Sequence, residues 1–76
     1  MIRLYDVVKL KEDREDIGVL SSYDGTVVDI VDHHGNRFYT VEFFDADGET
    51  IDESLYVYFR ENELEVVRKY EGKDEL

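Results

Sequence analysis

Short runs of β-branched and aromatic residues, separated by polar turn-forming segments, dominate this chain. The clearest run is Thr26–Val31, which directly follows the turn-forming pair Asp24 and Gly25. Arg37–Phe44 is a second such run, and the polar, glycine-containing residues 33–36 between the two runs predict a hairpin turn. The pattern therefore predicts two antiparallel strands at the centre of the fold.

The flanking segments predict a further strand and two connections. Leu4–Leu10 predicts the first strand. Lys11–Tyr23 is charged, then small and polar, and predicts a long loop with one irregular turn. Residues 45–48, Asp-Ala-Asp-Gly, predict a turn because Gly48 adopts a positive φ at no steric cost.

The last third of the chain predicts two short strands. Leu55–Phe59 predicts a fourth strand, and a tight helical turn around Asn62 precedes a closing strand, Glu65–Val67. No segment has the periodicity of a long amphipathic helix. Short strands punctuated by turns predict an all-β fold, and at this length a small five-stranded SH3-like barrel over residues 1–68 is the economical solution. We expect residues 69–76 to form a frayed acidic tail.

Alternation along each strand predicts which side chains form the core. Successive residues of a strand point to opposite faces, so an acid such as Asp29 or Glu42 marks the solvent side. Tyr56 and Tyr58 then lie on the outer face of the fourth strand. The residues predicted to point inward are Val8, Leu10, Val28, Ile30, Tyr39, Val41, Phe43, Leu55, Val57 and Phe59.

The net charge of the chain narrows the classes of partner that this domain could bind. Twenty acids against nine bases give a formal net charge of −11, and Glu42–Glu65 contains nine acids and one base (Arg60), a net of −8. Such an excess favours solubility and disfavours nucleic acid, whose binding proteins usually carry a basic patch. Two interpretations remain open: a merely solvated acidic surface, or the electrostatic complement of a basic partner.

The sequence predicts a cytoplasmic protein. It has no cysteine, which fits a reducing compartment, and no apolar stretch of the length of a signal peptide or membrane span. The final residues Lys73–Leu76 spell the retention signal of the endoplasmic reticulum. Because nothing directs entry into that compartment, we interpret this match as coincidence.

No pattern of catalytic or metal-binding residues emerges. Placing Gly48 at the sixth position of a calcium loop puts Phe43 at the first position and Ser54 at the twelfth, so the required ligands are missing. His33 and His34 are adjacent in a strand end and no third soft ligand accompanies them. We therefore expect no cofactor, no metal and no enzyme activity.

Four segments together resemble a known family. Asp6–Leu10, Gly25–Val31, Tyr39–Phe43 and the pair Asp47-Gly48 are similar to a family of small bacterial SH3-like barrel proteins of unknown function, over residues 5 to about 67. Members of that family often accompany toxin-like proteins, so the resemblance implies an antitoxin or immunity role. Gly25 before Thr-Val-Val also resembles KOW-type modules, although the basic residues that such modules cluster near this turn are absent.

The favoured hypothesis is a non-catalytic, acidic protein-binding module, monomeric in isolation, that blocks the basic cleft of a toxin such as a nuclease. Tyrosine suits the centre of an interface because it buries a large area while keeping a polar tip. One alternative is a KOW-like nucleic-acid or ribosome-associated domain with a basic patch from Arg3, Lys9, Lys11 and Arg14. Another is a homo-oligomer joined through strand edges. The predicted partner-binding residues are Asp45, Asp47, Glu49, Asp52, Glu53, Tyr56 and Tyr58.

Overall fold

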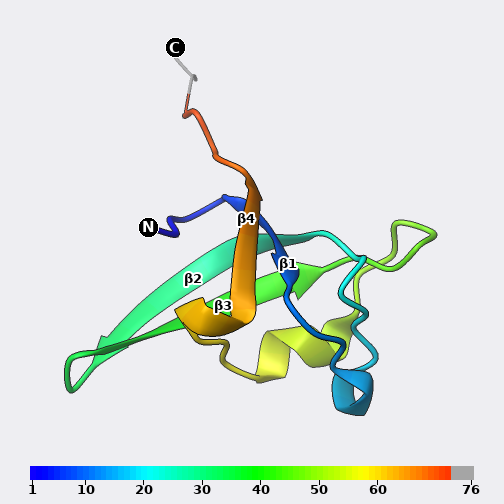
Figure 1. The fold of residues 1–76 in the computed structure, drawn as a ribbon, viewed down its shortest axis with the longest axis horizontal. Coiled ribbons are helices and arrows are strands. Elements are labelled where there is room, and N and C mark those ends of the chain that lie inside the picture. Colours follow the sequence, from blue (N-terminus) through cyan, green and yellow to red (C-terminus); the bar gives the residue numbers. More distant parts are fainter. Residues whose placement is uncertain (73–76) are drawn as a thin grey trace.

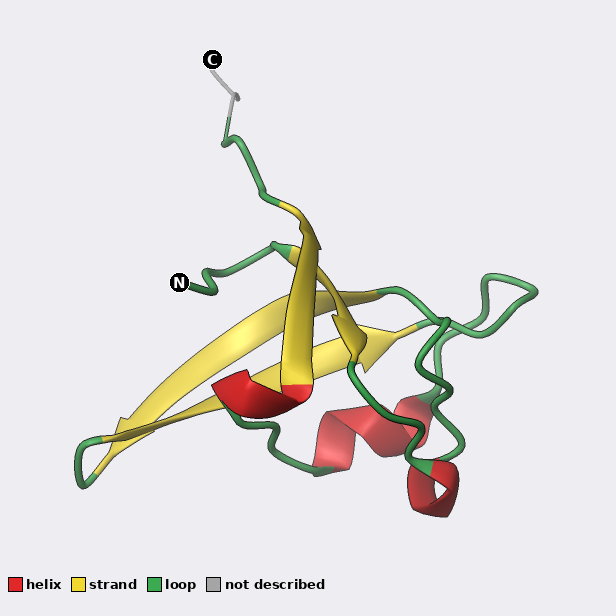
Figure 2. Cartoon of the chain, viewed as in Figure 1, coloured by secondary structure: helices red, strands yellow, loops and turns green. Residues whose placement is uncertain are grey.

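Four antiparallel strands form one twisted sheet in the computed structural model of this protein, which describes residues 1–72. The strands are β1 (Val7–Leu10), β2 (Gly25–His33), β3 (Asn36–Phe43) and β4 (Leu64–Arg68), in the order β3-β2-β1-β4 (Figure 1). Three 3-10 turns connect them: η1 (Glu15–Ile17), η2 (Asp52–Tyr56) and η3 (Glu61–Glu63) (Figure 2). The mostly β class is confirmed, but the sheet is not closed into the predicted barrel.

The predicted fourth strand, Leu55–Phe59, is wrong, and its loss leaves the sheet open. Its first residues belong to η2, and only Phe59 pairs with the sheet, exchanging two backbone hydrogen bonds of 2.8 Å with Tyr39. The start of this segment is instead attached to β3 through the Ser54 hydroxyl. This hydroxyl donates to the Ile51 carbonyl at 2.8 Å and accepts from the Phe43 amide at 3.2 Å, so it takes a place that a paired strand would occupy.

The predicted hairpin between β2 and β3 is confirmed. His33 pairs with Asn36, and the two residues between them, His34 and Gly35, have φ of 53° and 80°. Positive φ at both central positions is the type I′ geometry, whose twist matches that of the flanking strands. The hairpin extends away from the other strands as the longest arm of the molecule (Figure 1).

A β-bulge in β2 overturns one predicted core position. Val27 pairs with Val41 and Asp29 pairs with Thr40, so Val28 is an extra residue without a partner opposite it. The extra residue shifts the alternation: Val27 is fully buried, whereas Val28, which alternation placed inside, is 37% exposed. Ile30 follows the bulge and is partly buried against the core, as expected.

The core lies on one face of the sheet and is completed by the long loop. Residues 39, 41 and 43 of β3, together with Val8 and Leu10, are buried as predicted. Leu55, predicted to be inside, is exposed because η2 turns it outward. The loop contributes Ile17 and Val19, and Val19 pairs with Arg14 in an isolated bridge. The remaining core residues are Ile2, Val27, Phe59 and Leu64.

The two ends of the described chain meet at Asp6, a carboxylate that is only 1% exposed. It accepts hydrogen bonds from the Arg3 amide, the Tyr70 amide and Lys69 Nζ, each at 2.9 Å. Lys69 and Tyr70, which begin the tail that we expected to be frayed, therefore contact the N-terminal segment. Lys73–Leu76 lies outside the described residues. Within residues 1–72 no helix has the length and hydropathy needed to cross a membrane.

Candidate partner-binding surface

The acidic turn after β3 is built by Asp45. One oxygen of its carboxylate accepts hydrogen bonds from the amides of Asp47 at 2.9 Å and Glu49 at 3.0 Å, and its backbone bonds to Gly48 and Glu49 close the turn. Gly48 has a φ of 83°, which explains why glycine occupies this place. Asp45 is half-buried and its carboxylate holds the turn. Of the predicted site residues it is therefore the one with a structural role.

Asp52 and Glu53 lie next along the chain, in the first turn of η2, and both are exposed. The position is favourable for acids, because the free amides at the start of a helical turn carry partial positive charge. Ser54, which is fully buried, anchors η2 to β3 through the bonds described above. The turn and η2 are therefore attached to the same end of β3, opposite the hairpin tip (Figure 1).

The four exposed acids of this region, hereafter the acidic surface, form no ion pair within the described residues. They are Asp47, Glu49, Asp52 and Glu53. The five ion pairs within residues 1–72 all lie elsewhere and join Lys9 to Asp24, Arg14 to Asp16 and Glu63, Arg37 to Asp32, and Lys69 to Asp6. Four of the eight described basic side chains are thus paired with other acids, and none forms an ion pair with the acidic surface.

The two predicted tyrosines lie in different surroundings. Tyr56 ends η2 and is 85% exposed. Tyr58 is 61% exposed, and its ring centre lies 5.9 Å from that of Phe38 on β3. The Arg60 guanidinium lies over the Phe38 ring, 4.8 Å from the ring centre, and makes a cation–π contact with it. Sequence reasoning missed Phe38 and Arg60, because it considered only the core face of β3.

Tyr58 also lines a shallow hollow of about 330 Å³ together with Val31, His33 and Phe38. Val31 and Phe38 face each other across the hairpin. The structure therefore divides the seven predicted residues into three groups: Asp45 inside its turn, the acidic surface with the exposed Tyr56 beyond it, and Tyr58 in an aromatic patch on the hairpin.

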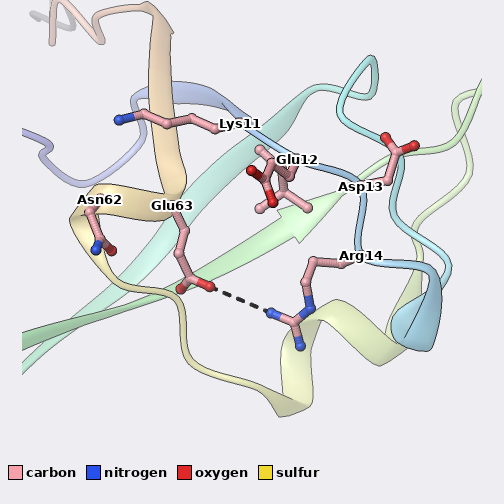
Figure 3. A pocket seen from close by; sticks show the side chains of 7 residues that line it. Lys11, Glu12, Asp13, Arg14, Asn62 and Glu63 are labelled. Atoms are coloured by element: carbon pink, nitrogen blue, oxygen red, sulfur yellow. Dashed lines mark ion pairs between the residues drawn. The ribbon is translucent and has the colours of Figure 1, made fainter.

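A second hollow, of about 280 Å³, lies between the loop after β1 and η3 (Figure 3). Arg14 points into it, 3.8 Å from Glu63, and donates two hydrogen bonds of 2.9 Å to Asp16. The hydrogen bonds to Asp16 raise the pKa of Arg14, so its charge is firmly held. Acids already neutralise this guanidinium. The other lining residues are Leu10, Lys11, Glu12, Asp13 and Asn62.

Two of the four residues of the basic patch proposed for nucleic acid, Lys9 and Arg14, form ion pairs within the chain. Lys9 lies 2.7 Å from Asp24 and also donates to the Ser22 carbonyl, and Arg14 is paired as just described. Among the described residues Arg3 and Lys11 are the members of that patch without an ion pair. Two isolated cations on a protein of net charge −11 give the nucleic-acid alternative no support.

The adjacent histidines stand side by side at the hairpin tip. The ring centres of His33 and His34 are 4.1 Å apart and their planes are nearly perpendicular. In residues 1–72 no group of three or more His, Cys, Asp or Glu side chains is arranged to hold a metal ion.

Comparison with known proteins gives a family and no function. None of the curated proteins and none of the solved structures matches this chain. The family model described as "Domain of unknown function (DUF4926)" matches residues 4–66, which include all four strands except the last two residues of β4. The chain therefore belongs to the DUF4926 family.

Proposed function

We propose that this protein is a non-catalytic binding module whose acidic surface docks against a basic protein. The observation that carries the proposal is the concentration of four exposed acids within residues 47–53, none of which forms an ion pair in the described chain. An exposed concentration of one sign of charge steers an oppositely charged partner and penalises wrong ones.

The partner that fits this surface best is a toxin with a positive cleft, such as a nuclease. A nuclease must attract phosphate, so its cleft is lined with Lys and Arg. Carboxylates standing where phosphates would lie accept the same charge-assisted hydrogen bonds and block the cleft. The resemblance to small bacterial SH3-like barrel proteins, which often accompany toxin-like proteins, favours the same class of partner.

Tyr56 supplies the apolar part of the contact. It follows Asp52 and Glu53 on η2, and most of its ring is free to be buried by a partner. Burial of an aromatic ring beside charged contacts is the usual composition of an interface centre. Truncation of Tyr56 should therefore accelerate dissociation, whereas removal of the acids should slow association.

An affinity pull-down from native lysate tests the proposal. The tagged protein is the bait, a salt gradient elutes the column, and mass spectrometry identifies the retained proteins. One stoichiometric basic protein that is lost from a bait with Asp47→Lys and Asp52→Lys supports the proposal. A bait with Glu12→Lys and Glu15→Lys, two exposed acids without ion pairs, is the matched control and should retain it. Equal retention by all three baits contradicts the proposal.

A further inference from the structure

The two outer edges of the sheet differ in whether their backbone groups are bonded. On the outer edge of β3, Tyr39 bonds with Phe59, the Phe43 carbonyl accepts from Ile51, and the Phe43 amide donates to Ser54. β4 is the other edge strand. Beyond its ladder with β1 and the bond from the Leu64 amide to the Glu61 carbonyl, no backbone hydrogen bond involves Leu64–Arg68 within the described chain. The outer edge of β4 is therefore open.

The side chains on this open edge are exposed and unpaired. β4 reads Leu-Glu-Val-Val-Arg, and Glu65, Val67 and Arg68 are all exposed. Neither Glu65 nor Arg68 has an ion pair within the described residues. Arg68 is one of four described basic residues without an ion pair, the others being Arg3, Lys11 and Arg60.

A bulge places the acid and the base on one face of β4. In a regular strand, residues three apart point to opposite faces. Here Lys9 pairs with Glu65 and Val7 pairs with Arg68, so the extra residue lies between them on β4. Lys9 and Val7 are two apart on β1 and share a face, and their partners Glu65 and Arg68 share it too.

We propose that β4 pairs antiparallel with β4 of a second copy of this chain, about a twofold axis between Val66 and Val67. This register sets Glu65 of each copy opposite Arg68 of the other, on the same face, and makes two cross-strand ion pairs. Opposite charges directly across a strand pair are stabilising, and like charges are destabilising. β4 carries one acid and one base, so the contact itself adds no net charge to a protein of −11.

The contact is short, so the dimer should be weak and in fast exchange. A five-residue strand pair lies below the size of stable interfaces, and we expect a Kd on the order of 100 µM. Sedimentation equilibrium measures the average molecular mass at protein concentrations from about tenfold below to about tenfold above this Kd. The salt concentration is about 0.15 M, so that long-range repulsion between the two acidic copies is screened.

Charge swaps test the register. In a dimer of the Glu65→Arg variant, the new arginine of each copy would lie opposite Arg68 of the other. In a dimer of the Arg68→Glu variant, the new glutamate would lie opposite Glu65. Like charges repel in both cases, so each variant alone should be monomeric. An equimolar mixture of the two restores both ion pairs and should dimerise at least as tightly as the unaltered protein. Glu12→Arg makes the same charge change as Glu65→Arg away from β4 and should leave the dimer intact. Amide spectra confirm that each variant is folded.

A monomeric unaltered protein at the highest concentration overturns the proposal. So does a dimer that both single variants retain, or a mixture no heavier than its two components. The double variant, with Glu65→Arg and Arg68→Glu in one chain, keeps the net charge and should dimerise like the unaltered protein.

Discussion

The buried carboxylate of Asp6 accepts a hydrogen bond from Lys69 Nζ at 2.9 Å, across 63 positions of sequence. Lys69 also donates to the Met1 carbonyl, and the ring of Tyr70 packs edge-on against Tyr5 with 5.4 Å between ring centres. The Asp6 side chain therefore joins the segment before β1 to the segment after β4 through hydrogen bonds.

Asp6→Asn should destabilise the protein by about 2 kcal/mol. The asparagine side chain has one acceptor oxygen where aspartate has two, and it lacks the negative charge that pairs with Lys69. One or more of the three donors, the Arg3 amide, the Tyr70 amide and Lys69 Nζ, would then lose its hydrogen bond. Urea unfolding measures the change. Asp47→Asn removes the same charge from an exposed position and should not lower stability. An equal loss in both variants would show that charge, and not the contacts of Asp6, is responsible.

The contribution of Asp6 should depend on pH. Burial alone would raise the pKa of the Asp6 carboxyl, but hydrogen bonds from Lys69, Tyr70 and Arg3 outweigh it and lower the pKa below 3.8. The unfolded chain then binds more protons than the folded one between the two pKa values. The stabilisation is therefore complete above the unfolded pKa and is lost as the pH falls through the lowered, folded pKa.

The measurement is the difference in unfolding free energy between the unaltered protein and Asp6→Asn at a series of pH values. The difference should be constant above about pH 5 and shrink below about pH 4. Subtraction removes the general gain in stability that acidification gives a protein of net charge −11. A difference that grows on acidification would contradict the lowered pKa.

Gly25→Ala should cost about 1–3 kcal/mol through overpacking. A Cβ atom at this position would lie 2.6 Å from both Phe43 Cδ1 and Val41 Cγ1, in the centre of the core. Thermal unfolding monitored by circular dichroism measures the effect. Unchanged stability would mean that β2 and β3 approach each other less closely than they do here.

Val27→Ala and Val28→Ala form a matched pair that tests the bulge. Val27 is fully buried, so truncating it should cost about 2 kcal/mol, whereas truncating Val28 should cost less than about 1 kcal/mol. Urea unfolding of both variants decides between the two alternations. A larger cost at Val28 would restore the regular alternation that the sequence alone predicts.

Sequence reasoning succeeded where the signal is local. The run Tyr39–Phe43 alternates without interruption, and His34-Gly35 is chemistry for a two-residue turn, so both the hairpin and the inward face of β3 were predictable. The sequence pattern could not reveal the bulge at Val28, because Val27 and Val28 are the same residue type and either could be the buried one.

Non-local and side-chain effects account for the wrong predictions. Leu55–Phe59 alternates like a strand, but its first two residues belong to η2, which the buried Ser54 hydroxyl bonds to β3. The Asp6–Lys69 contact joins residues too far apart for any sequence window. Of the candidate site, the positions of the acids were predictable from charge alone. The turn-building role of Asp45 had a signal, since aspartate commonly bonds to amides two residues on, but we had assigned it to binding.

The association rate between this protein and the basic partner retained in the pull-down tests the central claim most directly. Stopped-flow measurements at several salt concentrations give the rate for the unaltered protein, for Asp47→Lys with Asp52→Lys, and for the control Glu12→Lys with Glu15→Lys. We predict that the first pair of changes slows association by about tenfold or more at low salt and flattens its salt dependence, while the control stays close to the unaltered protein. An unchanged rate in the Asp47 and Asp52 variant would contradict the account and move the interface away from the acidic surface.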